Sequence, residues 1–281
     1  MKQATDRIEA TEPSGGNAIA KVCAIFRGLT ANRPLRLSEV ADIAGLNRVT
    51  ALRILDSLAN EGFVERQGSP PRYILGPEIA AMTKVATPST ELVGIVRPSL
   101  IRLAAETEDT ALLSVRINNE SVCLDRQTGT YPIRANFLEV GSRRPLGAGG
   151  GAMALLAWMP DLEIEAVLDA NASRIAAYPR LSLDVLRSYI RDARTRGYVL
   201  MVDVVVEKMG AIGAPIFDSS RSVVGALSVP ALTERTLGRE KEIAAAMLRE
   251  VARIERQLLD REGPRHNVKR NVRSGTSQRK E

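Results

Sequence analysis

The sequence predicts an α+β protein with two folded parts, a small helical domain followed by a larger domain of helices and strands. Three observations support this prediction. The length of 281 residues suits two modest domains better than one. Apolar residues recur at helical spacing in the first part of the chain. From Thr110 onward, the pattern changes to short alternating runs that are typical of strands.

The first domain is expected at residues 17–77, after a flexible leader at residues 1–16. Apolar spacing predicts a helix over residues 17–29. After a loop, Ser38 is expected to cap a short helix, because its hydroxyl can accept a backbone N–H bond. That helix is predicted to end at Gly45, which can adopt the left-handed turn conformation.

A longer helix comes next, with Asn47 as its predicted cap and Gly62 at its end. Its buried face is predicted to hold five apolar residues: Val49, Leu52, Leu55, Leu58 and Ala59. Residues 63–76 then alternate around a Gly-Ser-Pro-Pro turn, which indicates a two-stranded hairpin. This order of elements is that of a winged helix-turn-helix, whose second helix can enter the major groove of DNA.

Basic and hydroxyl side chains on the polar side of that second helix are the predicted DNA contacts, namely Arg48, Thr50 and Arg53. Arginine can bind guanine acceptors or phosphates, and threonine can contact a phosphate or a thymine methyl group. The hairpin adds Arg66 and Arg72 on either side of its tip. Paired helices and surface arginines are common, so the alternative is a winged helix that contacts a protein partner in place of DNA.

Residues 78–106 are predicted to form linker helices that could also supply a dimer contact. A Thr-Pro-Ser sequence at residues 87–89 is expected to interrupt them. Pro98 is expected to start a new helix, because proline fits the first helical turn.

The second domain is expected at residues 107–260, with helices that cover an antiparallel sheet. Two alternating runs flank Asn118-Asn119, which is a strong hairpin signal. Further strands are predicted at residues 132–137, 198–206, 211–217 and 222–229, and helices at residues 151–170, 182–196 and 238–260.

Glycine is concentrated in the sequence Pro-Leu-Gly-Ala-Gly-Gly-Gly-Ala-Met at residues 145–153. Such a run permits a close backbone approach and opens a helix whose N-terminal amides could receive an anion. It is not a phosphate loop, since no Gly-Lys-Ser/Thr follows, and it lacks the βαβ context of a dinucleotide site. Two interpretations remain, a tight strand-to-helix turn and the wall of a small-ligand pocket.

Catalytic and metal chemistry have little support in the sequence. The one histidine, His266, lies near the C-terminus, and Ser228 has no histidine base nearby. Cys23 and Cys123 are far apart and form no Cys-x-x-Cys pair, so we expect reduced thiols and no structural zinc. We therefore expect no enzyme activity, no catalytic residue, no metal and no cofactor. With no signal peptide and no apolar run of membrane-spanning length, a cytoplasmic location is expected.

The net charge of +6 is concentrated at the C-terminus. Residues 261–281 hold seven Lys and Arg against two Glu, which leaves only +1 for the remainder of the chain. We expect a disordered basic tail that adds sequence-independent attraction to DNA phosphates.

The order of these motifs resembles that of the IclR family of bacterial transcription regulators. The resemblance covers residues 17–258 and is carried by LSEVADIAGLNRVTALRILDSLANEGFV, RYILGPEI, RPSLIRLAAET, GSRRPLGAGGGAMALLA, RGYVL and AIGAPIFDSSRSVVGALSV. It implies an N-terminal winged helix, a linker helix and a C-terminal α/β effector-binding domain related to GAF-type sensors. It also implies a homodimer or a dimer of dimers on a double-stranded DNA operator, and operator binding that responds to a small-molecule effector.

The same resemblance implies the site residues. The family's recognition-helix motif falls on Arg48, Val49, Thr50 and Arg53, with Val49 where serine is usual. Its effector positions fall on Ile133, Asn136, Gly150, Gly151, Met201, Met209, Ala211, Ser228 and Pro230.

Several of these effector positions are apolar here, whereas members that bind small oxo- or hydroxy-acids carry acidic and polar groups there. The replacements predict a roomier and more apolar pocket, suited to an aromatic or larger hydrophobic carboxylic acid. Asn136, Ser228 and the amides of Gly150 and Gly151 would orient its polar end.

Overall fold

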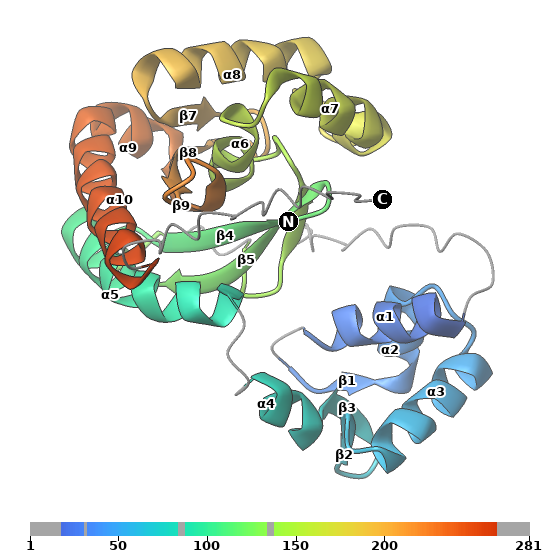
Figure 1. Cartoon of the computed structure of the whole chain (residues 1–281). Helices are drawn as coiled ribbons and strands as arrows, with labels where there is room; N and C mark the ends of the chain where they lie inside the picture. The colour runs from blue at the N-terminus through green and yellow to red at the C-terminus, as the bar shows by residue number, and fades with distance from the viewer. Residues whose placement is uncertain (1–17, 31–32, 84–87, 134–137, 263–281) are drawn as a thin grey trace, which may run out of the picture.

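The computed structural model describes residues 18–30, 33–83, 88–133 and 138–262, which form two domains (Figure 1). A helix-turn-helix domain precedes a larger domain of mixed helices and strands, which confirms the predicted α+β class and the order of the domains.

The N-terminal domain packs three helices against a three-stranded sheet of order β1-β3-β2. Its elements are α1 (Ala18–Leu29), β1 (Leu35–Arg36), α2 (Leu37–Ile43), α3 (Arg48–Asn60), β2 (Val64–Gln67) and β3 (Arg72–Leu75). Apolar side chains from the helices and the sheet meet in one core, which includes Ile25, Val40, Leu55 and Tyr73. The short strand β1 was not predicted; it pairs with β3 through Leu35 and Tyr73 and thereby joins the hairpin to the helices.

The helix ends of this domain agree with the sequence at Asn47, Gly45 and Gly62. The Asn47 side chain accepts the N–H of Thr50 at 2.8 Å, and the two glycines have φ values of 64° and 76°. Ser38, by contrast, lies inside α2 and is not its cap. The N-cap of α2 is Arg36, whose backbone N–H donates to the Glu39 carboxylate at 2.8 Å. The Glu39 carboxylate, three residues after the N-cap, therefore accepts a backbone N–H bond at the start of this helix, a role that was expected of the Ser38 hydroxyl.

The linker region contains α4 (Pro77–Thr83) and α5 (Pro88–Thr107), whereas residues 84–87 lie outside the described part. The helix α5 continues through Pro98, so the prediction of a new helix at this proline is wrong. Buried side chains on both sides, including Leu92 and Leu100, pack onto the core of the second domain. This packing stabilises the helix against the hydrogen bond that proline removes.

The C-terminal domain is built on a six-stranded antiparallel sheet of order β6-β5-β4-β9-β8-β7. Its strands are β4 (Ala111–Ile117), β5 (Glu120–Gln127), β6 (Arg143–Pro145), β7 (Val199–Val202), β8 (Met209–Phe217) and β9 (Val223–Leu232). Its helices after α5 are α6 (Gly150–Ala157), α7 (Asp161–Ile175), α8 (Leu183–Arg196), α9 (Thr233–Gly238) and α10 (Glu240–Glu262).

The two faces of this sheet carry different helices, because successive side chains of a strand point to opposite faces. Leu113, Val115 and Ile212 belong to a core shared with α5 and α10 (Figure 1). The opposite face meets α6, with α7 and α8 outside it, in a second apolar core. Leu112, Ser114 and Ser228 alternate onto this second face.

Three predicted elements of this domain differ from the structure. Residues 132–133 form bends and residues 134–137 lie outside the described part, so the observed edge strand is β6. The strand predicted to reach residue 206 ends at Val202, because Asp203 turns the chain with a φ of 60°. The last helix is divided into α9 and α10, and α10 runs two residues beyond the predicted end at 260, which places Arg261 and Glu262 in the helix.

Candidate nucleic-acid interface and ligand cavity

The first turns of α3 present basic and apolar side chains to solvent. Arg48 and Arg53 are exposed, and Thr50 is half-buried beside the Asn47 cap. Val49, which was predicted on the buried face, is 70% exposed, and Leu52 is also exposed, so that part of the prediction is wrong. The core-facing positions of the helix are Ala51 and Leu55. Val49 therefore shares the outer surface with the arginines.

The arginines of this domain fall into two groups. The guanidinium groups of Arg48 and Arg53 have no hydrogen bond or ion pair within the described residues. Arg66 on β2 forms an ion pair with Asp56 of α3 and lies 5.7 Å from the centre of the Tyr73 ring. Arg72 on β3 donates to the carbonyl of Pro34 at 3.3 Å. The hairpin arginines are thus tied to the domain, whereas those of α3 are available to a partner.

A cavity lies in the C-terminal domain between the sheet, the start of α6 and the connection from β7 to β8. It contains about 630 Å³ of space outside the lining atoms, including its open side. Its apolar wall includes Leu112, Leu138, Met201, Val204, Val205, Val206, Met209 and Pro230. A mostly apolar lining with a few polar groups is typical of a small-molecule site.

The polar groups of the cavity extend from the edge of the sheet at β6 to the central strands β4 and β9. Its hydroxyl groups come from Ser114, Ser121, Ser142 and Ser228, and Arg144 is the charged residue among the described residues of the lining. Ser114, Ser121 and Ser228 are 5%, 6% and 4% exposed, and within the described part of the chain their hydroxyls have no hydrogen-bond partner. Because these residues line the cavity, their hydroxyls are available to a polar group of a ligand.

The glycine run shapes this cavity by a close approach of backbones. A Cβ added at Gly150 would lie 2.8 Å from that of Ala211, and one at Gly213 would lie 2.3 Å from the Gly150 carbonyl oxygen. The first turn of α6 therefore crosses β8 with no room for a side chain. The N-cap Gly149 has a φ of 116°, which only glycine adopts readily. Both interpretations of the run therefore fit, a tight turn and a pocket wall.

The structure brings together six of the nine effector positions implied by the resemblance. They are Gly150, Met201, Met209, Ala211, Ser228 and Pro230, all in the cavity lining. Gly151 lies behind the lining, where an added Cβ would be 3.1 Å from the hydroxyls of both Ser114 and Ser228. Ile133 is 57% exposed in a bend and is not part of the lining, so its prediction as a pocket residue is not supported by its position. Asn136 lies outside the described residues.

Sequence reasoning missed three polar residues of the lining: Arg144 on the edge strand β6, Ser121 on its neighbour β5, and Ser114 on the central strand β4. A signal was available for Ser114, which is a small polar residue within the largely apolar strand β4, whereas the more polar strand β5 gave no such signal for Ser121. Cys123 lies on the same face, and burial raises the pKa of its thiol to about 12. The thiol is therefore protonated at neutral pH and acts as a small apolar group.

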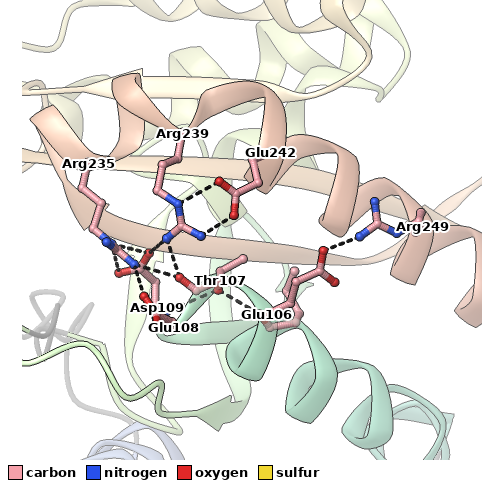
Figure 2. Close-up of polar contacts among 9 residues, drawn as sticks. Glu106, Thr107, Glu108, Asp109, Arg235, Arg239, Glu242 and Arg249 are labelled. Carbon is pink, nitrogen blue, oxygen red and sulfur yellow. Dashed lines mark hydrogen bonds and ion pairs between the residues drawn. The ribbon is translucent and has the colours of Figure 1, made fainter.

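A network of charged groups joins the end of α5 to α9 and α10 (Figure 2). Arg235 donates to both carboxylate oxygens of Asp109, at 3.0 and 2.9 Å, and to the carbonyl of Thr107 at 2.9 Å. Arg239 donates to the same carbonyl at 2.7 Å and pairs with Glu242. Two guanidinium groups thereby satisfy a C-terminal carbonyl of α5, where cations are also favoured by the helix dipole.

The side chain of Asp109 is only 3% exposed. Burial raises its pKa, although Arg235 and Arg239 act in the opposite direction. The guanidinium of Arg235 also lies 3.9 Å from the centre of the Tyr131 ring. We call the group formed by Thr107, Asp109, Arg235 and Arg239 the α5 clamp.

The α5 clamp is connected to the cavity through α9. Thr233, the first residue of α9, donates its hydroxyl to Asp203 at 2.9 Å. The same Asp203 oxygen accepts the N–H of Lys208 at 2.7 Å, which closes the turn that carries Val204, Val205 and Val206. A continuous set of contacts therefore leads from the cavity wall to the end of α5.

Two further classes of site were sought in the described part of the chain. That part contains no group of three or more His, Cys, Asp or Glu residues that could hold a metal ion. None of the helices described there is both long and apolar enough to cross a membrane.

Comparison with known families gives two matches that together cover most of the chain. Residues 18–68 match the IclR helix-turn-helix domain, and residues 84–255 match the domain described as "Bacterial transcriptional regulator IclR C-terminal".

Among individual proteins, the chain is 30% identical over 249 residues to the HTH-type transcriptional regulator Rv1719 of Mycobacterium tuberculosis. That match covers 87% of this chain and 93% of the relative. Among solved structures, the chain is similar to an IclR transcriptional regulator from Alicyclobacillus acidocaldarius, with a TM-score of 0.71, 21% identity and coverage of 85% and 97%. It is also similar to an IclR homologue from Microbacterium hydrocarbonoxydans complexed with 4-hydroxybenzoate, with a TM-score of 0.71, 23% identity and coverage of 86% and 99%.

Proposed function

The chain belongs to the IclR family of bacterial transcriptional regulators, and on that premise we propose that a small hydrophobic carboxylic acid in its cavity changes its binding to an operator. The family supplies the coarser statement, a regulator with a helix-turn-helix domain and a C-terminal effector domain. The operator contacts, the class of effector and the route between them are proposed from the residues.

For DNA, α3 inserts into the major groove, with Arg48 and Arg53 on base edges or phosphates. The observation that supports this placement is the pair of exposed guanidinium groups without a protein partner. Thr50 and Val49 lie beside them, suited to a phosphate and a thymine methyl group. Arg66 and Arg72 flank the groove from the hairpin and act chiefly through their positive charge. Two such domains, in a homodimer or a dimer of dimers, read half-sites spaced by about 34 Å or a multiple of it.

For the effector, the single observation that carries the proposal is the composition of the cavity. One wall is apolar, with Met201, Met209 and Pro230, and the opposite corner carries hydroxyls and the N-terminus of α6. An amphipathic acid with an apolar body satisfies both sides, because helix N-termini favour anions. The similar protein from M. hydrocarbonoxydans was crystallised with 4-hydroxybenzoate, which belongs to this chemical class.

For the response, ligand binding shifts the β7–β8 turn, and α9 and the α5 clamp pass this shift to the linker helix. Differential contact with the ligand in two arrangements of this route would provide the coupling free energy. The protein acts as a cytoplasmic regulator and performs no catalysis on the acid.

The proposal is tested by selecting genomic fragments that bind the full chain, with and without candidate acids. The expected result is enrichment of a pseudo-palindromic site and a change of its affinity in the presence of an aromatic carboxylate. Stabilisation by small aliphatic oxo-acids but not by aromatic acids, measured by thermal shift, would count against the effector class. Capture of proteins without enrichment of any DNA site would favour a winged helix that contacts a protein partner.

A further inference from the structure

We propose that Asp203 and Thr233 form a joint that sets how strongly occupation of the cavity affects the end of α5, with little effect on the affinity for the ligand. The inference rests on the proposed function for the existence of an effector. It adds which contact carries the response, and it separates that contact from ligand binding. Among the described residues of the cavity lining, neither Asp203 nor Thr233 is present, so both are positioning residues.

The turn between β7 and β8 has an uncommon backbone conformation at both ends. Asp203 and Lys208 each have a φ of 60°. Residues other than glycine are strained in this left-handed region and remain there where surrounding contacts fix them. One carboxylate oxygen of Asp203 accepts the Lys208 N–H at 2.7 Å, and the Asp203 N–H donates to the Met209 carbonyl at 2.9 Å. The valines at residues 204–206, which line the cavity, therefore lie in a turn whose shape depends on Asp203.

The same carboxylate oxygen connects this turn to α9. It accepts the hydroxyl of Thr233 at 2.9 Å, and the Thr233 N–H donates to the carbonyl of Lys208 at 2.9 Å. Thr233 is the first residue of α9, so both ends of the turn are bonded to the start of this helix. A change of the turn that moves Asp203 must therefore break these hydrogen bonds or move α9 with it.

The helix α9 contacts both the cavity wall and the α5 clamp. It has only six residues, and Thr236 among them is fully buried. Thr236 packs on Gly210 of the cavity lining, where an added Cβ would lie 2.7 Å from the threonine hydroxyl. The preceding residue, Arg235, donates to the Asp109 carboxylate and to the Thr107 carbonyl (Figure 2). Movement of this short helix therefore changes contacts at the end of α5.

The position of the Thr233 hydroxyl separates transmission from binding. Its removal leaves the three valines of the turn in the cavity wall, but it deletes a bond between the turn and α9. A ligand shifts an equilibrium by its differential affinity for two arrangements, and the joint determines how far the end of α5 differs between them. Loss of the joint should therefore reduce the response much more than the affinity.

Three threonine variants and one aspartate variant test this role. Thr233→Val removes the hydroxyl and keeps the branched shape, whereas Thr233→Ser keeps the hydroxyl. Thr195→Val is the matched control, because the Thr195 hydroxyl donates to the carbonyl of Arg191 within α8 at 3.0 Å. Asp203→Asn weakens the acceptor and is the second probe of the joint. Melting temperatures show whether each variant is folded.

The first measurement needs no ligand. Hydrogen–deuterium exchange of the full chain, followed by mass spectrometry, compares the turn at residues 203–208 with the end of α5 at residues 103–109. We expect Thr233→Val to exchange about two- to tenfold faster in both segments, the range that corresponds to loss of one hydrogen bond. Asp203→Asn should act in the same direction, whereas Thr233→Ser and Thr195→Val should match the wild type at the end of α5.

The second measurement uses benzoate, phenylacetate and 1-naphthoate as ligands. Isothermal titration calorimetry gives the Kd of each acid, and fluorescence anisotropy gives the Kd for the selected operator with and without it. We expect at least one acid to bind the wild type and to change the operator Kd by about fivefold or more. Thr233→Val should keep the Kd of this acid within about twofold and reduce the change in operator Kd to near onefold. Thr233→Ser should restore the change.

The possible failures are distinguishable. Unchanged exchange at the end of α5 in Thr233→Val, or a full operator response in this variant, overturns the joint and leaves the proposed function intact. A loss of acid affinity as large as the loss of response also overturns it, because the hydroxyl would then shape the cavity. If none of the acids binds the wild type, the proposed class of effector is contradicted, and the exchange measurement without ligand still decides on the joint.

Discussion

The exposed arginines of α3 and several arginines of the C-terminal domain differ in whether they have partners within the protein. In the helix-turn-helix domain, Arg48 and Arg53 stand on α3 without a partner among the described residues. In the C-terminal domain, Arg235, Arg239 and Arg102 each bind carboxylates or carbonyls of distant segments. An unpaired guanidinium keeps its donors for a ligand, whereas a paired one fixes the fold. Whether a guanidinium has a partner within the protein, and not the net charge of the domain, therefore distinguishes an arginine available to a ligand from one that stabilises the fold.

Among substitutions that test this difference, Arg235→Met is expected to have the largest effect, a loss of stability. The substitution leaves the buried Asp109 carboxylate without the guanidinium N–H that donates to both of its oxygens, so the free energy of unfolding should fall by about 3–5 kcal/mol. Urea denaturation monitored by circular dichroism measures the loss. The double variant with Asp109→Asn should lose less than the sum of the two single variants, because it also removes the buried charge.

Arg187→Met is the control for this prediction. Arg187 pairs with Glu165 and Asp184 on the exposed surface of α7 and α8, and its loss should leave the unfolding midpoint near that of the wild type. Equal destabilisation by the two methionine variants would show that the α5 clamp has no special structural role.

The next effect is expected at the exposed surface of α3. Arg53→Ala should weaken operator binding by about 1–3 kcal/mol if the arginine contacts a base, with relaxed sequence preference at that position. The free energy of unfolding should stay within about 0.5 kcal/mol, because the guanidinium has no partner to lose. Fluorescence anisotropy with operator DNA measures the first quantity and urea denaturation the second. Ser57→Ala, near the other end of α3, should change operator affinity little; an unchanged affinity for Arg53→Ala would remove this arginine from the interface.

The sequence predicted the helix-turn-helix domain well because its signals are local. The cap at Asn47 and the left-handed glycines act within a few residues, and hairpin alternation needs no tertiary information. Val49 was misplaced because apolar spacing alone cannot distinguish a core residue from an apolar residue on the surface. Its neighbour Ala51 provides the small contact that faces the core.

The cavity was predicted only in part because its polar corner depends on strand register. Arg143 and Arg144 are identical in type and adjacent, and only the pairing of Ser121 with Arg144 shows which one lines the cavity. Ile133 was assigned to the pocket through the family resemblance, and it lies in a bend at residues 132–133 where a strand was expected. Spacing along the chain does not reveal which strand forms the edge of a sheet.

A smaller effect, on both stability and operator binding, is expected at Arg66, which has partners within its domain but remains partly exposed. Its ion pair with Asp56 and its contact with the Tyr73 ring are both partly exposed, so Arg66→Met should cost about 0–1 kcal/mol of stability. Operator affinity should fall by a similar amount for all sequences and depend less on salt, because a phosphate contact is lost without any base contact. A change in sequence preference, measured on a set of operator variants, would instead place Arg66 among the base-reading residues.

The smallest effect is expected from pH, through Glu250 on α10. Burial raises the pKa of this carboxyl, but the hydrogen bonds from Arg102 and Ser99 and the charges of Arg102 and Arg253 outweigh it, so its folded-state pKa lies below the ordinary value of 4.5. A carboxyl with a lowered folded-state pKa stabilises the protein above its unfolded-state pKa, and this stabilisation is lost as the pH falls through the folded-state value. Part of the wild-type stability should therefore disappear below pH 4.5, whereas Glu250→Gln, less stable at neutral pH, should show a flatter profile there. Glu234→Gln, at an exposed position of α9, should reproduce the wild-type slope in urea denaturation over this range. Parallel profiles for the wild type and Glu250→Gln would mean that the acid sensitivity arises elsewhere, and that pairing of this buried carboxylate with Arg102 contributes little to the structural role of arginine in the C-terminal domain.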